Sequence, residues 1–472
     1  MKIKKIIVTI SCMALWAMTF TAEAKSYKRG VSENRFQYHA QMEAIADGVT
    51  WFYNWSNTVG NYIADQEFLE FTPQIWNGNF NADNIRKFVQ AHPDTKYILG
   101  FNEPNFKSQA NMTPQYAAER WPEIQSLAKE LNLKTVAPAL NYSPDAPYYN
   151  PTDWMDEFVR LVGSDAFDFT AIHNYGGYGG LVDLATKFHD RYGKPVWVTE
   201  FCYWPGEMGD VTVASQLSSM VESVEWLEKT DWIYRYAWFK ATEDSRANFK
   251  LIESGKGEDP RELTELGHVY VHMSDFDSEV YHPVEQYVPA SEYINRQLAG
   301  LGRSNDATNP KPIEVTNFNS GAGMDYQFDV SADGKYNLEL RVTGVGEPVR
   351  FDPKLSVVAV NADGKDGATL SPAQQFGLPG NETDYRSVIF PLELKAGKQT
   401  LRIRDVNTYA PSGLRISTIR LASQAGVDNV TVDADVEPVY YNLNGVRMTG
   451  NNLLPGVYVK VAGGKTTKII VK

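Results

Sequence analysis

Two patterns of hydrophobic and polar residues follow one another along the chain. Up to about residue 273, short apolar runs alternate with segments in which apolar residues recur every three or four positions. Such runs are typical of buried strands, and the three-to-four spacing is typical of amphipathic helices. The predicted strands cover residues 28–31, 49–54, 69–76, 97–101, 134–140, 167–175, 195–201 and 233–239, and the clearest predicted helices cover residues 34–46, 82–91 and 214–227.

Eight strands that alternate with helices within about 250 residues predict an α/β fold, the closed (β/α)8 or TIM barrel. An open doubly wound sheet is the structural alternative. Such a sheet usually has fewer strands, and its nucleotide-binding form carries a glycine-rich phosphate loop that this sequence lacks. The barrel is therefore the preferred fold for residues 25–273.

After residue 273 the pattern changes to simple alternation of apolar and polar residues. Residues 324–330 and 336–342 alternate in this way on either side of a turn-forming segment, which predicts a β-hairpin. Further alternating segments complete an all-β sandwich over residues 274–423. They cover residues 355–360, 400–405 and 414–421, and a short β segment follows over residues 424–472.

The first 24 residues have the pattern of a cleaved secretory signal. Three lysines precede an apolar run, and an Ala-Glu-Ala sequence ends at Ala24. The apolar run is short for a membrane span, and no later segment approaches one. Cys12 precedes most of the run, so simple cleavage is preferred over a lipoprotein anchor. We expect a bacterial protein, secreted or at the cell surface, with no transmembrane segment.

The amino-acid composition limits the kinds of molecule that the protein is expected to bind. The formal net charge of −13 argues against nucleic acid and anionic membranes. Cys202 is the one cysteine beyond the signal, so no intrachain disulfide is expected in the mature chain. The histidines lack metal-ligand spacing, and neither a metal nor an organic cofactor is predicted. The 11 Trp and 26 Tyr suit either a sugar-binding surface or a bulky core.

The candidate chemistry lies at two strand ends. Glu103 ends the fourth predicted strand in "KYILGFNEPNF", and Glu200 ends the seventh in "KPVWVTEFCYW". Functional side chains of such barrels come from the carboxyl ends of the strands, so both carboxylates are expected to face one cleft. Glutamate at a strand end also caps helices, but two acids across a cleft are what glycosidic cleavage needs.

The neighbours of the two acids fit this hypothesis. Asn102 is placed to reach a sugar 2-hydroxyl, and Pro104 stiffens the turn that aims Glu103. The sixth strand ends in "AIHNYGGYGG", which brings His173 and Tyr175 near the second acid. A tyrosine hydroxyl that donates to a carboxylate favours its charged form. A buried histidine with satisfied hydrogen bonds is the alternative for His173.

Aromatic residues gather at the same predicted rim. Sugar rings stack on flat aromatic side chains, although strand residues also alternate into the barrel core. The residues at the last position before a loop are the better candidates for substrate contact, and they are Trp55, Trp76, Trp204 and Trp238. Cys202 has no evident histidine partner and is expected to be a packed thiol.

Four motifs resemble a known family. With "KRGVS" on the first strand, "GFNEPN" on the fourth, "FTAIHNY" on the sixth and "VWVTEF" on the seventh, residues 28 to about 272 resemble glycoside hydrolase family 128. The resemblance implies a retaining endo-β-1,3-glucanase on a (β/α)8 barrel, with Glu103 as acid/base and Glu200 as nucleophile.

The later segments carry weaker resemblances. The sandwich is similar to family 6 carbohydrate-binding modules through "YQFDVSADGKYNLELRV" and "SGLRISTIRLA". Arg415 stands where sugar-binding members often have asparagine, so a purely structural sandwich stays an alternative. The final segment, with "YNLNG" and "LLPGVYVKV", is similar to C-terminal sorting domains of exported bacterial proteins.

We therefore expect an exported, monomeric glycoside hydrolase that cleaves β-1,3-glucan internally. Three alternatives stay open. The chain could be a related β-glycanase acting on mannan, xylan or an algal galactan. It could be a non-catalytic surface protein that captures polysaccharide, or a structural or adhesive surface protein.

Overall fold

The computed structural model describes most of the predicted barrel and sandwich. The described residues are 25–34, 36–59, 68–206, 210–345, 351–407, 412–424, 439–442, 447–448, 453, 456–462 and 465–471. The predicted signal segment, residues 1–24, lies outside them. Among the helices that the structure describes, none is both long and apolar enough to span a membrane.

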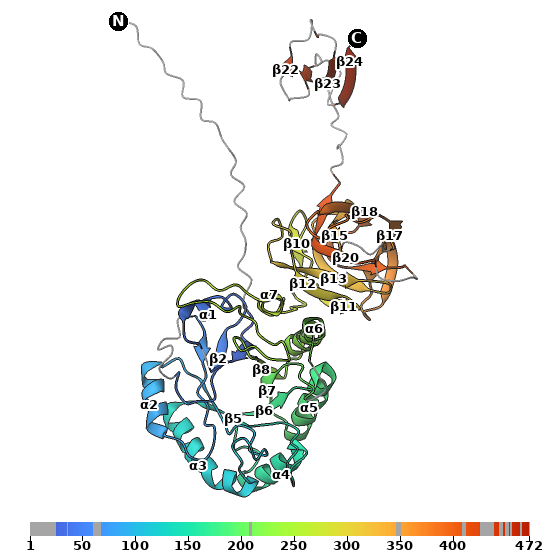
Figure 1. Cartoon of the computed structure of the whole chain (residues 1–472). Coiled ribbons are helices and arrows are strands. Elements are labelled where there is room, and N and C mark those ends of the chain that lie inside the picture. The colour runs from blue at the N-terminus through green and yellow to red at the C-terminus, as the bar shows by residue number, and fades with distance from the viewer. Residues whose placement is uncertain are drawn as a thin grey trace, which may run out of the picture.

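The first half of the chain forms one curled parallel sheet ringed by helices (Figure 1). Its strands are β1 (Arg29–Ser32), β2 (Trp51–Tyr53), β3 (Glu70–Phe71), β4 (Tyr97–Leu99), β5 (Lys134–Leu140), β6 (Phe169–Asn174), β7 (Val196–Phe201) and β8 (Ile233–Phe239). Their order is β3-β2-β1-β8-β7-β6-β5-β4, with every neighbouring pair parallel. The predicted mixed α/β fold with eight parallel strands is confirmed.

The seam between β3 and β4 departs from the prediction. The expected strand 69–76 is reduced to two residues, because Pro73 has no N–H to continue the strand pairing. Regular pairing therefore stops at this edge. Three backbone hydrogen bonds still join the two sides: Leu99 N donates to Pro73 O, Ile75 N to Leu99 O and Asn102 N to Trp76 O, each at 2.9 Å.

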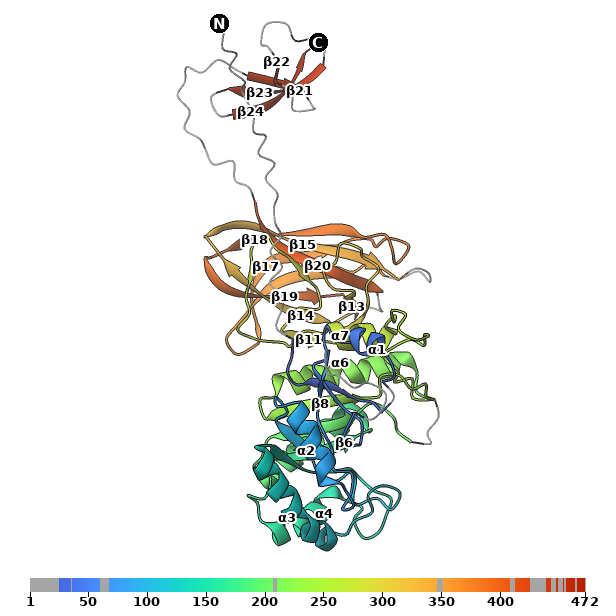
Figure 2. The same cartoon turned by 90° about the vertical axis from the view of Figure 1, so that its left-hand side faces the viewer.

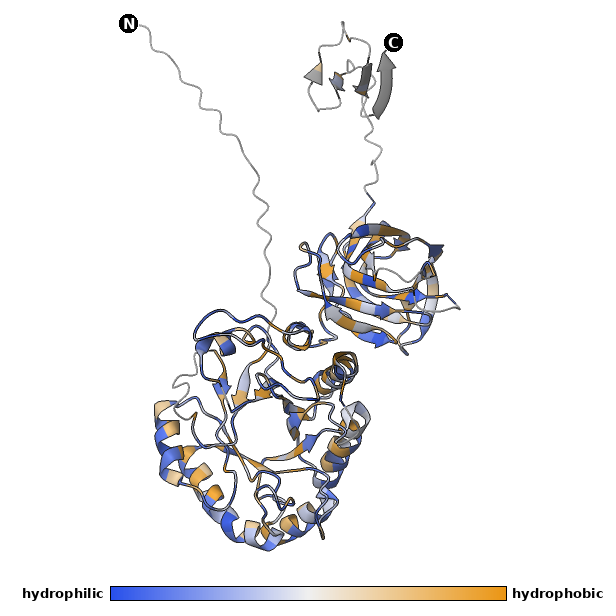
Figure 3. Cartoon of the chain, in the orientation of Figure 1, coloured by the Kyte–Doolittle hydropathy of each residue, from blue (hydrophilic) through white to orange (hydrophobic). Residues whose placement is uncertain are grey.

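The helices lie outside the sheet, with polar and apolar residues mixed along each of them (Figure 3). They are α1 (His39–Glu43), α2 (Ala82–Ala91), α3 (Pro114–Leu131), α4 (Pro151–Val162), α5 (Gly177–Tyr192), α6 (Val213–Lys229) and α7 (Glu265–His272). The first is shorter than the predicted helix 34–46, whereas α2 matches its prediction. Four of the described helices begin at side-chain caps, in which Asn81, Thr113, Thr212 and Thr264 accept from backbone N–H groups.

The inside of the ring is filled by side chains on alternate positions of the strands. Trp51, Tyr97, Phe169 and Trp197 are all buried there. Gly30 is required beside them, because a Cβ at this position would lie 2.4 Å from the Trp51 indole. These aromatic side chains fill the amino-terminal side of the curled sheet, and functional side chains of such folds come from the carboxyl ends of the strands.

Two sheets follow the helical half. One contains β10 (Tyr287–Pro289), β12 (Gly300–Arg303), β13 (Ile313–Phe318), β15 (Gly334–Gly344), β18 (Arg386–Leu394) and β20 (Leu414–Ser423). The other contains β9 (His282–Pro283), β11 (Asn295–Gln297), β14 (Gly323–Val330), β16 (Lys354–Val360), β17 (Asp366–Gln375) and β19 (Gly397–Asp405). Both sheets are antiparallel except where β9 pairs with β14 in parallel, and both contribute buried residues to a core between them.

The predicted hairpin of residues 324–330 and 336–342 is wrong. The first segment, β14, pairs with β19, whereas the second, β15, pairs with β18 and β20 in the opposite sheet. Alternation shows that each strand has one buried face, but a strand keeps that pattern whether its neighbour in sequence joins it or crosses to the facing sheet.

The two halves meet through α6 and α7, which contact β12 and β13 (Figures 1 and 2). An ion pair at 3.0 Å joins Glu225 on α6 to Arg296 on β11. At the end of the chain, β21 (Val439–Asn442), β22 (Arg447–Met448), β23 (Gly456–Ala462) and β24 (Lys465–Val471) form a separate antiparallel sheet.

Candidate active site

The two predicted carboxylates lie at the carboxyl end of the curled sheet. Glu103 follows β4, Glu200 belongs to β7, and they are only 7% and 4% exposed. The Glu103 backbone N–H donates to Ala139 O on β5 at 2.9 Å, and its φ is 41°. Left-handed backbone is uncommon for residues other than glycine and gathers at functional sites.

His173 lies between the two acids. Its Nδ1 is 3.0 Å from Glu103 Oε1, and its Nε2 is 3.4 Å from Glu200 Oε1. The ring is fully buried on β6, where His173 is the register partner of Glu200. Burial by itself lowers the pKa of His173, but the nearby charges of Glu200 and Glu103 outweigh this, so the pKa lies above the ordinary histidine value.

Glu200 accepts hydrogen bonds from three aromatic side chains. Trp55 Nε1 and Tyr53 OH donate to Oε1 at 2.7 Å and 3.0 Å, and Tyr175 OH donates to Oε2. Tyr53 and Tyr175 have pKa values well above the ordinary tyrosine value, chiefly because of burial, so both remain protonated donors.

The charge state of Glu200 reflects opposing effects. Burial raises its pKa above the ordinary glutamate value, and the negative charge of Glu103 adds to the rise. His173 opposes the rise, as do the hydrogen bonds from Tyr175 and Trp55. The donors thus reduce the cost of holding a buried carboxylate without cancelling it, and such perturbed groups in a cleft are characteristic of functional sites.

Asn102 is buried immediately beside Glu103, with 3% of its surface exposed. Its Nδ2 donates to Gln109 Oε1 at 3.3 Å. Its Oδ1 is buried and has no hydrogen-bond partner among the residues that the structure describes. An unpartnered buried acceptor next to Glu103 in sequence is a candidate for contact with a ligand hydroxyl.

The four predicted rim tryptophans have different settings. Trp55 is partly buried and donates to Glu200, and Trp76 is partly buried against the core. Trp204 is 38% exposed, with its ring 6.4 Å from that of Tyr175. Trp238 is 1% exposed, donates to Phe249 O at 2.8 Å and packs on the α7 residue Tyr270. Trp238 therefore faces the helix layer, away from the two acids.

Sequence reasoning selected neither Tyr53, one of the rim aromatics of the second strand, nor Phe239 as a site residue. Tyr53 lies two residues before Trp55, and the alternation of side chains along a strand could have identified it as facing the same side. Phe239 directly follows Trp238 and points to the opposite side, with its ring 5.3 Å from Tyr175 and 5.9 Å from Trp55. Phe239, and not the predicted Trp238, therefore lines the site.

Other reactive groups lie outside this chemistry. Cys202 is buried, and burial raises the pKa of its thiol well above the ordinary value. Within the described parts of the chain, no group of three or more His, Cys, Asp or Glu side chains is arranged to hold a metal ion. The arrangement consists of two acids, one imidazole and aromatic donors, which suits acid–base and nucleophilic chemistry.

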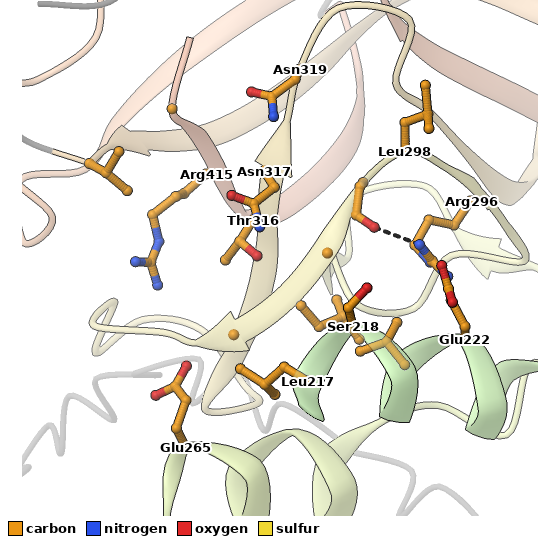
Figure 4. A pocket seen from close by; sticks show the side chains of 17 residues that line it. Leu217, Ser218, Glu222, Glu265, Arg296, Leu298, Thr316, Asn317, Asn319 and Arg415 are labelled. Carbon is orange, nitrogen blue, oxygen red and sulfur yellow. Dashed lines mark hydrogen bonds between the residues drawn. The ribbon is translucent and has the colours of Figure 1, made fainter. Parts of the chain in front are cut away.

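A separate cavity of about 530 Å³ lies between α6, α7 and the sandwich (Figure 4). Its two arginines are engaged within the protein. Arg296 donates to Ala299 O at 2.6 Å, and Arg415 pairs with Glu314 and, at 3.3 Å, with Glu382. This cavity contains neither catalytic candidate, so its size does not make it the site of chemistry.

Comparison with known proteins assigns the first half of the chain to a glycosyl hydrolase family. Residues 30–270, which include both glutamates, match the family described as "Glycosyl hydrolase catalytic core". Alkali-sensitive linkage protein 1 of Schizosaccharomyces pombe is 23% identical over 235 residues, 48% of this chain and 41% of that protein. The chain therefore spans about two fifths of the length of this curated relative.

Two bacterial crystal structures are similar to about half of this chain, and both are of family 128 subgroup II endo-β-1,3-glucanases. The Pseudomonas viridiflava enzyme is 33% identical, with 53% of this chain and 99% of that chain covered and a TM-score of 0.49. For the Sorangium cellulosum enzyme the identity is 28%, the coverages are 52% and 98%, and the TM-score is 0.46. Since the family match spans half of the chain, this protein belongs to the glycosyl hydrolase catalytic core family and is a glycoside hydrolase.

Proposed function

We propose that this glycoside hydrolase cleaves β-1,3-glucan at internal linkages with retention of anomeric configuration. The observation that carries the mechanism is the pair of buried carboxylates, Glu103 and Glu200, on either side of His173. Two acids of this kind supply the acid/base and the nucleophile of a double displacement.

The contacts of each acid suggest its role. Glu200 accepts from Tyr53, Trp55 and Tyr175, and several donors to one carboxylate orient it and favour its charged form. Glu103 has His173 as its side-chain partner, which leaves its other oxygen available to a leaving group. Glu200 is therefore assigned as the nucleophile and Glu103 as the acid/base.

The reaction then has two steps. Glu200 attacks the anomeric carbon while Glu103 protonates the departing glycosidic oxygen. Glu103, now a carboxylate, takes a proton from water, which attacks the same carbon and releases Glu200. Asn102 Oδ1 accepts from a sugar hydroxyl beside Glu103, and the exposed Trp204 offers a stacking surface on the side of Glu200.

The substrate class rests on sequence similarity. The four motifs around the two acids resemble family 128, and the P. viridiflava endo-β-1,3-glucanase shares 33% identity over nearly its whole length. On the same basis we infer that the curled sheet is the (β/α)8 barrel of that family, with the bonds at residues 73–76 serving as its closing seam.

The other regions complete the proposal. Residues 1–24 are a cleaved signal, and the mature monomer is secreted or held at the cell surface. Residues 274–423 form a module similar to carbohydrate-binding family 6, and residues 424–472 form a sorting segment. Arg415 donates to Glu314, Glu382 and Arg303 O, and this engagement favours a structural role for Arg415 over direct sugar contact.

The test is hydrolysis of laminarin, curdlan, mannan and xylan by the mature protein and by Glu103→Gln and Glu200→Gln. We expect oligosaccharides from the two β-1,3-glucans alone, with activity lowered by about 10²-fold or more in both variants. The matched control is Glu222→Gln, on the exposed face of α6, which should retain full activity.

Other results would change the proposal in distinct ways. Products from mannan or xylan would change the assigned substrate and leave the assigned mechanism unchanged. Unchanged activity in either active-site variant would remove that residue from its role. If the protein retains polysaccharide but hydrolyses none of it, the proposed enzyme function would be replaced by polysaccharide capture.

A further inference from the structure

The two oxygens of Glu200 have unequal environments. Oε1 accepts two hydrogen bonds, from Trp55 Nε1 at 2.7 Å and from Tyr53 OH at 3.0 Å, and His173 Nε2 lies 3.4 Å from it. Oε2 accepts one hydrogen bond, from Tyr175 OH. A carboxylate oxygen has two lone pairs, so two donors occupy Oε1 whereas Oε2 retains a lone pair that can attack.

Trp55 is held in a way that keeps Oε1 occupied. Its φ is 60°, in the left-handed region that costs free energy for a bulky residue. Its indole packs against Tyr53 at 5.4 Å and against Phe239 at 5.9 Å, and Lys240 Nζ lies 5.4 Å from its ring centroid. The indole N–H is therefore directed at Glu200 by packing on several sides.

We propose that Oε2 of Glu200 is the attacking atom and that Trp55 is a positioning residue for the nucleophile, not a platform on which a sugar ring stacks. The inference rests on the proposed function, in which Glu200 is the nucleophile. In the first step a bond forms between Oε2 and the anomeric carbon. The bond to the glycosidic oxygen breaks with its electron pair on that oxygen, which takes the proton of Glu103.

The product of this step agrees with the same contacts. When Oε2 becomes the ester oxygen, Oε1 becomes the ester carbonyl, and a carbonyl oxygen still accepts two hydrogen bonds. Trp55 and Tyr53 thus keep their partner throughout the step. Attack by Oε1 would instead require both donors to leave a buried acceptor, with the loss of two hydrogen bonds.

The direct test traps the glycosyl-enzyme in the full mature protein. The probe is a laminaribioside with fluorine in place of the 2-hydroxyl and dinitrophenolate as leaving group. Mass spectrometry of peptides locates the adduct, and a crystal structure of the trapped protein identifies the bonded oxygen. We expect an ester through Oε2, with Oε1 still within hydrogen-bond distance of Trp55 and Tyr53.

The outcomes separate the inference from the proposed function. An ester through Oε1 of Glu200 would overturn the inference and leave the nucleophile in place. Folded protein that forms no adduct on Glu200, or forms it on another residue, would overturn the proposed function itself.

A second test uses Trp55→Phe, which keeps a ring and removes the N–H donor. We expect kcat/KM on laminarin to fall about 10- to 100-fold, mainly through kcat, because a hydrogen bond to a charged group is lost. The acidic limb of the pH profile should move to higher pH, since fewer donors favour the neutral acid. The matched control is Trp232→Phe, whose ring stacks on His189 and makes no hydrogen bond to either acid within the described residues.

A stacking platform would behave differently. In that case Trp55→Phe would raise KM, leave kcat nearly unchanged and leave the pH profile where it is. That pattern would overturn the positioning role.

Discussion

Two buried glutamates lie at opposite ends of the curled sheet, and their contacts show why one suits catalysis and the other stabilises the fold. Glu200, at the carboxyl end of β7, shares His173 with a second acid. Glu228, near the end of α6, pairs with Arg29 at 2.9 Å and also accepts from Ser26 and Tyr236. Both acids receive tyrosine hydroxyls, so burial and tyrosine donors alone do not mark an active site.

The difference lies in the charge opposite each acid. Each side-chain nitrogen of Arg29 donates to a nearby acceptor, and these hydrogen bonds connect the start of β1 to the end of α7 and to the chain beyond it. Its acceptors are Glu228 Oε1, Tyr236 OH and the carbonyl oxygens of Tyr270, Met273 and Ser274. Glu228 is thus neutralised within the fold by an arginine, whereas Glu200 shares one histidine with a second acid and keeps a lone pair for chemistry.

The largest expected effect tests the supporting glutamate. Arg29→Met should lower the free energy of unfolding by about 3 to 5 kcal/mol, because Glu228 is left as an uncompensated buried charge. Calorimetry of the full chain should show a clear fall in Tm. At a temperature where the variant is folded, kcat on laminarin should stay close to that of the unchanged protein.

The control for Arg29→Met is the same substitution at an exposed arginine. Arg86→Met, which removes the surface pair with Glu130, should leave Tm nearly unchanged. A large loss of activity in folded Arg29→Met would show that the two ends of the sheet are not independent.

The next effect concerns the pH dependence of Glu200. Because its pKa is raised, the acidic limb of kcat/KM should lie above the ordinary glutamate value of 4.5. In Glu103→Gln one like charge is gone, so the carboxylate of Glu200 is favoured and the limb should move to lower pH. The substrate is dinitrophenyl β-laminaribioside, whose leaving group needs no protonation, so kcat/KM of the variant can be measured. A limb that moves upward would contradict the coupling of the two acids.

The smallest effect extends the comparison to histidines. His268 on α7 has its ring 6.1 Å from that of His272, and neither of its ring nitrogens has a partner among the described residues. Burial lowers its pKa to about 4, and the positive Arg303 and neighbouring His272 contribute. His173, between two acids, has its pKa raised instead.

A histidine with a lowered folded-state pKa stabilises the protein above its unfolded pKa of about 6.5, and that stability is lost as the pH falls towards 4. Between pH 7 and pH 5, Tm should therefore fall less in His268→Leu than in the unchanged chain. Since His268 is one partly buried side chain, we expect a shift of only a few degrees. Equal slopes in the two proteins would show that His268 does not contribute to this pH dependence.

Local patterns were sufficient where one element decides its own structure. The helix over residues 82–91 matches α2, and the strands over 134–140 and 233–239 match β5 and β8. Strand ends also placed Glu103 and Glu200 at the same edge of the sheet, since parallel strands share a direction. The resemblance of the motifs to a glycoside hydrolase family pointed to the same two residues.

Local patterns failed where the answer depends on which surfaces meet. Residues 324–342 alternate as a hairpin does, yet their two strands enter opposite sheets. Trp238 stands at a strand end as predicted, but it faces the helices, and its neighbour Phe239 lines the site. Pro73 shortened a predicted strand, a signal that was present in the sequence.

By itself, the sequence determined the order and kind of the main elements, the position of the two acids at the carboxyl ends of their strands, and the family. These properties depend on spacing along the chain, which covalent geometry and hydrophobic periodicity control. Only the tertiary structure decided that Tyr53, Trp55 and Tyr175 converge on Glu200, that His173 lies between the acids, and that one carboxylate oxygen is more crowded than the other. Two of those contacts, from Tyr53 and Trp55 to Glu200, join residues more than a hundred positions apart. Their geometry follows from the curvature of the sheet, which no local pattern encodes.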